Sequence, residues 1–211
     1  MDPSSFVSEN TVLLAPPLVP EVRLHLAAEM LPLWRKTEEE LEAMGVPPPY
    51  WAFAWAGGQA LARYILDNPD EVRGKRVLDF GSGSGLVSIA AAKAGAAHVV
   101  AADVDDYAAA AIALNARAND VTVDVVTDDV IGSDGGWQTI LCGDMCYERP
   151  LAEKLLVWLR ARGGTRILLG DPKRSYFPQT GVSRLATYRV QTTRDLEDSE
   201  IRETGVFALE A

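Results

Sequence analysis

Cysteine is scarce in this sequence, which excludes a disulfide framework and argues against a metal site. The two cysteines, Cys142 and Cys146, are four residues apart, with no histidine or further cysteine nearby to complete a ligand set. A chain of 211 residues buries enough apolar surface to fold without crosslinks or a metal. We therefore expect no metal, and we expect both cysteines to pack as small side chains beside the end of a strand.

Long apolar runs and an excess of positive charge are also missing. No apolar segment approaches the roughly 20 residues that cross a bilayer. The first residues lack the basic start and apolar stretch of a secretory signal, and they are not arginine-rich like a transit peptide. The formal net charge is −10, and an acidic surface repels phosphate backbones and anionic lipid. These absences predict a cytoplasmic protein without nucleic-acid or membrane partners.

The composition is that of one globular domain with an N-terminal extension. Residues 1–20 are polar and then proline-rich, and we expect them to form an extended arm. A capping box, Thr37 with Glu40, predicts a helix over 37–44 that Gly45 ends. We therefore divide the chain into an N-terminal arm and helix (1–45) and a main domain (46–211), and we expect a monomer.

Beyond residue 75, short apolar runs alternate with alanine-rich segments. The runs predict strands at 76–80, 98–103, 121–126, 139–143, 166–170, 188–192 and 206–209. The clearest helices between them are predicted at 86–94, 107–118 and 151–160, and a further helical segment is predicted at 57–66, before the sheet. This alternation is typical of an α/β fold with a mainly parallel sheet covered on both faces. No long helix separates the last two strands, so we expect them to pair antiparallel at one edge.

The most informative segment is a strand that enters a helix through Gly81, Gly83 and Gly85. Such a loop lets a ligand approach the backbone closely, beside the positive end of the next helix. The dinucleotide pattern G-x-G-x-x-G requires a glycine at position 86, where this chain has Leu86. A carboxylate at Asp79 opposes a pyrophosphate and suits a ligand with an ammonium group.

The pattern D-x-G-x-G-x-G from Asp79 resembles the main motif of class I S-adenosylmethionine-dependent methyltransferases. That resemblance implies S-adenosylmethionine as cofactor and a Rossmann-like sheet of seven strands whose last strand is antiparallel. Asp103 ends the next strand, where a carboxylate accepts both hydroxyls of a ribose. After the third strand, Asp128 or Asp129 is placed to meet the adenine amino group, and the sequence does not decide between them.

The fourth strand leads into Asp144-Met145-Cys146-Tyr147, which resembles the [DE]-x-x-[YF] element of protein-lysine methyltransferases with seven strands. Enzymes that methylate amino groups of nucleic acids usually carry Asn or Asp followed by Pro-Pro and an aromatic residue here, and this chain does not. We expect Asp144 to bind and align the substrate ammonium, and Tyr147 and Trp55 to offer aromatic faces to the cationic sulfur or to methyl-lysine. The segment 171–174 is a candidate contact with a protein substrate.

The resemblance extends over residues 45–180. The segments 49–61, 66–69, 143–147 and 170–172 match, in order and spacing, the electron transfer flavoprotein β-subunit lysine methyltransferases. This resemblance implies methylation of lysines on that flavoprotein subunit, and it implies that Trp55 and the Gly57-Gly58 backbone line the cofactor pocket. Mitochondrial members carry a transit peptide, so its absence here leads us to expect a bacterial protein.

Taken together, the expected site has a catalytic pair, Asp144 and Tyr147, and a larger set that binds the cofactor. The expected cofactor-binding residues are Trp55, Gly57, Asp79, Gly81, Ser82, Gly83, Gly85, Asp103, Val104, Asp128 and Gly143. Two alternatives remain. One is a methyltransferase that acts on another protein, such as ribosomal protein L11, or on a small amine. The other is a nicotinamide oxidoreductase or a non-catalytic nucleotide-binding module.

Overall fold

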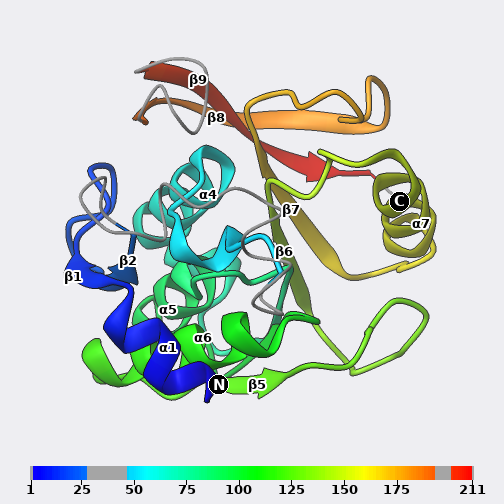
Figure 1. Ribbon diagram of the computed structural model, residues 1–211. Helices are drawn as coiled ribbons and strands as arrows, with labels where there is room; N and C mark the ends of the chain where they lie inside the picture. Colours follow the sequence, from blue (N-terminus) through cyan, green and yellow to red (C-terminus); the bar gives the residue numbers. More distant parts are fainter. Residues whose placement is uncertain (1, 28–46, 193–200, 211) are drawn as a thin grey trace.

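The computed structural model describes residues 2–27, 47–192 and 201–210, which are built around one seven-stranded sheet (Figure 1). The predicted helix at 37–44 lies outside the described residues. The strands of the sheet are β3 (Arg76–Phe80), β4 (His98–Ala102), β5 (Asp124–Val126), β6 (Thr139–Gly143), β7 (Arg166–Asp171), β8 (Val182–Gln191) and β9 (Ile201–Leu209). Their spatial order is β5-β4-β3-β6-β7-β9-β8.

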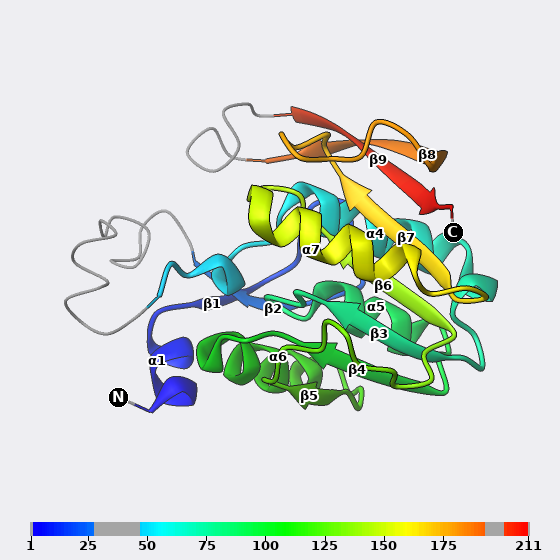
Figure 2. The same cartoon turned by 90° about the vertical axis from the view of Figure 1, so that its right-hand side faces the viewer.

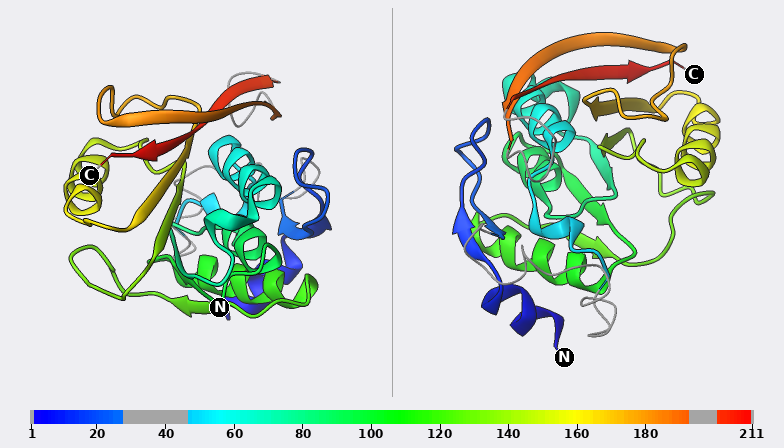
Figure 3. Two further views of the ribbon diagram at one scale, coloured as in Figure 1. Left: turned by 180° about the vertical axis from the view of Figure 1, so that it is seen from behind. Right: turned by 45° about the horizontal axis from the view of Figure 1, so that its top comes forward.

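The strand directions confirm a mainly parallel sheet with an antiparallel last strand. The pairs β3–β4, β3–β6, β4–β5 and β6–β7 are parallel, whereas β9 is antiparallel to both β7 and β8. The order reverses between β3 and β6, so their carboxyl ends flank the crevice where doubly wound sheets bind ligands. The edge strands are β5 and β8, and the long β8–β9 pair passes over α4 (Ala56–Asp67) in Figure 3.

Helices cover both faces of the sheet, as the alternating sequence predicts. Figure 1 shows α4, α5 (Leu86–Lys93) and α6 (Asp106–Ala118) on one side and α7 (Arg149–Arg160) on the other. Neighbouring residues of a strand enter opposite cores: Leu141 packs with α4 and α5, and Ile140 packs with α7. In the described part of the chain, no helix has both the length and the apolar composition that a bilayer crossing requires.

The expectation of an extended arm over residues 1–20 was wrong. Residues Pro3–Glu9 form helix α1, which begins where the Asp2 carboxylate accepts the Ser5 N–H (2.8 Å). The arm continues into a two-stranded sheet of β1 (Val12–Leu14) and β2 (Leu24–Leu26). Helix α1 lies beside α6 (Figure 2) because Phe6 packs edge-on against Trp51 and Tyr107.

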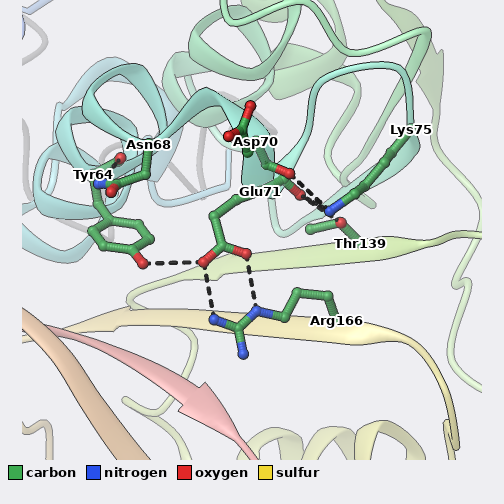
Figure 4. Close-up of polar contacts among 7 residues, drawn as sticks. All are labelled: Tyr64, Asn68, Asp70, Glu71, Lys75, Thr139 and Arg166. Carbon is green, nitrogen blue, oxygen red and sulfur yellow. Dashed lines mark hydrogen bonds and ion pairs between the residues drawn. The ribbon is translucent and has the colours of Figure 1, made fainter.

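At the opposite end of the strands from the crevice, an ion pair ties η2 (Pro69–Glu71) to the sheet (Figure 4). Arg166, the first residue of β7, donates two hydrogen bonds of 2.9 Å to the Glu71 carboxylate. Tyr64 donates a third (3.0 Å), and Thr139 of β6 donates to the Glu71 carbonyl (2.9 Å). One acidic residue thereby joins the start of two strands to α4.

We expect Glu71→Gln to lower the free energy of unfolding by about 1–3 kcal/mol, because it weakens a bidentate, charge-assisted pair. The Arg166 guanidinium lowers the pKa of Glu71, so this stabilisation is present above the ordinary glutamate pKa and is lost as pH falls through the lowered one. Urea unfolding at a series of pH values measures both effects. Asp70→Asn, the same change at an exposed neighbour, is the control, and an equal loss there would contradict the prediction.

Candidate active site

The loop between β3 and α5 is held in a shape that only glycine adopts freely. Gly81, Gly83 and Gly85 have φ angles of 64°, 53° and 79°, in the left-handed region. Gly81 and Ser82 donate backbone hydrogen bonds to the carbonyl of Ala102 (2.9 and 3.1 Å). The loop therefore crosses the carboxyl ends of β3 and β4 without side chains of its own at these three positions.

The Asp79 carboxylate lies beneath this loop and is only 1% exposed. Its Oδ2 accepts hydrogen bonds from the Ser82 hydroxyl (2.6 Å), the Ser88 N–H (2.9 Å) and the Ser88 hydroxyl (2.6 Å). Burial raises the pKa of Asp79 to about 6. Asp79 is not among the described residues that line the neighbouring cavity. Through Oδ2, this carboxylate braces the loop against α5.

A cavity of about 620 Å³ opens at the carboxyl ends of β3, β4 and β6, a size that suits a small-molecule ligand. Most of the expected site residues line it. They are Trp55, Gly81, Gly83, Asp103, Val104, Asp128, Gly143, Asp144 and Tyr147. Gly57, Ser82 and Gly85 lie behind this wall, as Asp79 does, and are not among the described lining residues.

Five carboxylates line the cavity, and three of them form no ion pair among the described residues. Asp103 accepts the Gly83 N–H (2.8 Å) and the Asp105 N–H (3.1 Å), and Asp105 caps α6 by accepting the Tyr107 N–H (2.8 Å). Burial raises the pKa of Asp103, and it raises that of Asp105 to about 6. With Asp128, these groups accept hydrogen bonds from hydroxyl and amino groups and repel phosphates. The residues present therefore fit a cationic nucleoside such as S-adenosylmethionine better than a dinucleotide.

The structure distinguishes Asp128 from Asp129 by their partners. Asp129 forms an ion pair with Lys154 (2.7 Å), which lowers the Asp129 pKa, and it also accepts the Ile131 N–H (2.9 Å). Asp128 lines the same cavity and makes no hydrogen bond or ion pair within the described ranges. Of the two carboxylates, Asp128 is the one that a ligand reaches without breaking an existing pair.

On the other wall, the amino end of α4 lies directly against β6 and β7, because four glycines meet there. A Cβ at Gly57 would overlap the carbonyl oxygen of Gly170, and a Cβ at Gly170 would overlap that of Gly57. A Cβ at Gly143 would lie 3.0 Å from the Cα of Gly58. No side chain larger than hydrogen fits between the helix and these strands.

Asp144 follows β6 at this junction, in a left-handed conformation (φ 60°). Its N–H donates to the Gly170 carbonyl (2.9 Å), and its Oδ2 accepts the Gly58 N–H (2.8 Å). Trp55, the residue before α4, provides no side-chain cap, so Asp144 supplies one from another part of the chain. Its Oδ1 accepts two hydrogen bonds from Arg174, from Nε (2.9 Å) and Nη2 (2.6 Å). Asp144 is buried and lies at the cavity wall.

Aromatic side chains surround the same part of the cavity. The Tyr50 ring is 6.1 Å from that of Trp55 and 5.8 Å from that of Tyr147, centroid to centroid. The indole N–H of Trp55 donates to the Tyr50 carbonyl (2.9 Å), and the Arg174 guanidinium lies 5.5 Å above the Trp55 ring. Burial raises the pKa of Tyr147, which keeps its hydroxyl neutral. These rings offer electron-rich faces to a cation.

Several lining residues were not predicted from the sequence. Met145 has its sulfur against Gly81, Lys154 holds Asp129, and Asp105 belongs to the helix cap of α6. The Asp-Asp-Tyr start of that helix was a usable capping signal. Arg174 had been assigned only to a possible substrate contact, because no local pattern connects it with Asp144, 30 residues earlier.

Comparison with solved structures places the fold among the class I S-adenosylmethionine-dependent methyltransferases. The magnesium protoporphyrin IX methyltransferase of Synechocystis PCC 6803, solved with its cofactor, superposes with a TM-score of 0.55. The match covers 73% of this chain and 78% of that one at 19% identity, so it speaks for the fold alone. Residues 59–142 also match the family model of ribosomal protein L11 methyltransferase (PrmA).

Curated relatives then define the family. The electron transfer flavoprotein β-subunit lysine methyltransferase of Xenopus laevis is 40% identical, over 99% of this chain and 87% of its own length. The Danio rerio protein of the same name is 42% identical, over 87% of this chain and 72% of its own. The chain belongs to the electron transfer flavoprotein β-subunit lysine methyltransferase family.

We expect Gly57→Ala to destabilise the protein by about 1–3 kcal/mol, because the new methyl group meets backbone that cannot rotate away. The matched control is Gly58→Ala in the same turn, where the nearest atom to a new Cβ is 4.0 Å away. That substitution is expected to be neutral or to stabilise by up to about 1 kcal/mol through helix propensity. Thermal unfolding of both variants checks the prediction, and equal losses would contradict it.

Proposed function

We propose that this protein transfers the methyl group of S-adenosylmethionine to lysine residues of the electron transfer flavoprotein β-subunit. The observation that carries the proposal is that Asp144 and Tyr147 line the same cavity as the glycine loop and Asp103. A ligand that lies on the loop thereby has an acidic and aromatic surface beside it. The names of the curated relatives support the flavoprotein subunit as substrate.

The cofactor brings a methyl group bound to a cationic sulfur, and this chain's residues would hold it by three kinds of contact. Asp103 accepts hydrogen bonds from the ribose hydroxyls. Asp128 accepts one from the adenine amino group, and Val104 covers the base. The backbone of Gly81, Gly83 and Gly143 approaches the remainder closely, and Trp55 packs against it. Gly57, Asp79, Ser82 and Gly85 act indirectly, by shaping the loop and the start of α4.

The lysine is the nucleophile, and it reacts only as the neutral amine. Its ordinary pKa is about 10.4, so neutralisation at pH 7 costs about 4–5 kcal/mol. The positive sulfur and the apolar walls lower that pKa. Asp144 and Tyr147 align the amine with the methyl carbon, which makes the reaction effectively unimolecular. The proton passes to water.

A second protein substrate, ribosomal protein L11, is the alternative that the family-model match raises. That match ends at Cys142, before the acceptor motif from Asp144 to Tyr147 begins. It therefore supports the chemistry of the cofactor half of the site and not the choice of acceptor. A small amine would need none of the acidic surface that a net charge of −10 provides.

We also propose that residues 46–211 form the methyltransferase domain, that residues 1–45 are an accessory segment, and that the protein acts as a monomer in a bacterial cytoplasm. The acidic charge supports a protein partner with exposed lysines over nucleic acid or an anionic membrane. α1 packs against α6, beside the cavity wall, which is consistent with a supporting role for the N-terminal segment.

The first test concerns the cofactor. S-adenosylhomocysteine is expected to bind and to raise the unfolding temperature, whereas NAD is not. We expect Asp103→Asn to weaken S-adenosylhomocysteine binding about 10-fold to 100-fold, because a charge-assisted hydrogen bond is lost. Asp106→Asn, an exposed acid on α6, is the matched control. Calorimetry that gives both variants wild-type affinity would rule out Asp103 as a ligand.

The second test concerns the acceptor. The wild-type protein, with labelled cofactor, is expected to methylate recombinant flavoprotein β-subunit and not ribosomal protein L11 or free lysine. Asp144→Asn is expected to lower kcat at least about 100-fold with S-adenosylhomocysteine affinity retained, because alignment of the amine is lost. Glu148→Gln, an exposed acid four residues on, should leave kcat unchanged. Methylation of L11 alone would contradict the proposed substrate.

A further inference from the structure

The carboxylate that faces the substrate lysine is already paired with a cation. Arg174 donates from Nε and Nη2 to Asp144 Oδ1, and the side chains of the two residues are 16% and 10% exposed. The other oxygen of Asp144 accepts the Gly58 N–H. Asp144 and Arg174 both line the cavity. A lysine that reaches the site therefore meets a neutralised pair and not an isolated negative charge.

Arg174 is held in this position from two directions. Asp171, the last residue of β7, accepts the Arg174 N–H on Oδ1 (2.6 Å), which fixes the turn after the strand. The guanidinium lies over the Trp55 ring at 5.5 Å. The second oxygen of Asp171 is buried without a hydrogen-bond partner among the described residues. The turn and the indole together direct the arginine toward Asp144.

Burial shifts three further titratable groups near this pair toward their neutral forms. Burial raises the pKa of Asp171 to about 7, that of Cys146 to about 12, and that of Tyr147 above its ordinary value. Arg174 is the cation that forms an ion pair with Asp144 (2.6 Å). Without it, Asp144 would stabilise the ammonium form of the lysine, which has no lone pair with which to react.

We propose that Arg174 is a positioning residue that neutralises Asp144, so that the carboxylate orients the lysine as a neutral amine instead of holding it as an ammonium ion. This inference rests on the proposed function. In this arrangement the amine donates one N–H to the Asp144 carboxylate. The lysine first loses a proton to water. Its lone pair then forms the N–C bond while the C–S bond breaks, and that electron pair returns to sulfur.

The test uses n-butylammonium chloride as a probe for the lysine side chain, with calorimetry at pH 7 on protein saturated with S-adenosylhomocysteine. Arg174→Gln is expected to bind the probe at least about tenfold more tightly than wild type, because the carboxylate is no longer compensated. Arg174→Lys keeps a cation and should stay within about threefold of wild type. Unchanged probe binding by Arg174→Gln, or a loss of its S-adenosylhomocysteine affinity, would overturn the proposal.

Two further measurements separate charge compensation from a purely structural role. Asp144→Asn added to Arg174→Gln should return probe binding to the wild-type level. Because the double variant has no unpaired charge at this position, it can be measured even if the single variant does not fold. Tighter binding by the double variant would overturn the proposal. With the flavoprotein subunit, Arg174→Gln should move the rising limb of the kcat–pH profile at least about one unit upward. Arg117→Gln, an exposed arginine in the last turn of α6, should leave the profile in place.

The outcomes distinguish this proposal from the proposed function. The probe experiment needs neither the flavoprotein subunit nor methyl transfer. If the wild-type protein did not methylate the flavoprotein subunit, the substrate assignment would fail while the difference between Arg174→Gln and wild type still tested the role of the arginine. If methylation proceeded and neither the probe affinity nor the pH profile changed, only the role of Arg174 would be wrong.

Discussion

The contact between the amino end of α4 and the ends of β6 and β7 is the constraint on which the acceptor side of the site depends. It exists because Gly57, Gly143 and Gly170 have no side chains to separate the helix from the strands. Asp144 bridges this contact by capping the helix and bonding to the Gly170 carbonyl. The same carboxylate is thus a structural cap and a wall of the cavity, so stability and chemistry share one residue.

The sheet could be predicted from the sequence because its strands are buried on both faces and read as continuous apolar runs. The strand boundaries were predicted less well where only one face is covered. β8 begins at Val182 and not at residue 188, since exposed polar side chains interrupt its pattern at the sheet edge. Helix α1 was missed because its polar start resembles a loop, although Asp2 and Pro3 together are a helix-start signal.

The sequence predicted those site residues whose positions depend on where a strand ends. In a parallel sheet, residues that follow neighbouring strands meet at one edge, which brings Asp103 and Asp144 to the same cavity. The direction in which a side chain points depends on tertiary packing, so it cannot be predicted from the spacing of residues in the sequence. Asp79 turns toward Ser82 and Ser88 for this reason. The left-handed backbone conformation of Asp144 likewise could not be predicted from the neighbouring residues in the sequence.

The position of β9 has a consequence for how the chain acquires its structure. β9 pairs with β7 on one side and with β8 on the other, although it comes last in the sequence. During synthesis from the N-terminus, β7 and β8 are made before β9. The edges that they later pair with β9 therefore stay unpaired until β9 has been made. Phe207 then packs with α7 and Val206 with α4, so the last segment made completes the cores on both faces. A nascent chain that ends before residue 201 therefore leaves the β9-facing edges of β7 and β8 unpaired, and unpaired strand edges tend to pair with other chains.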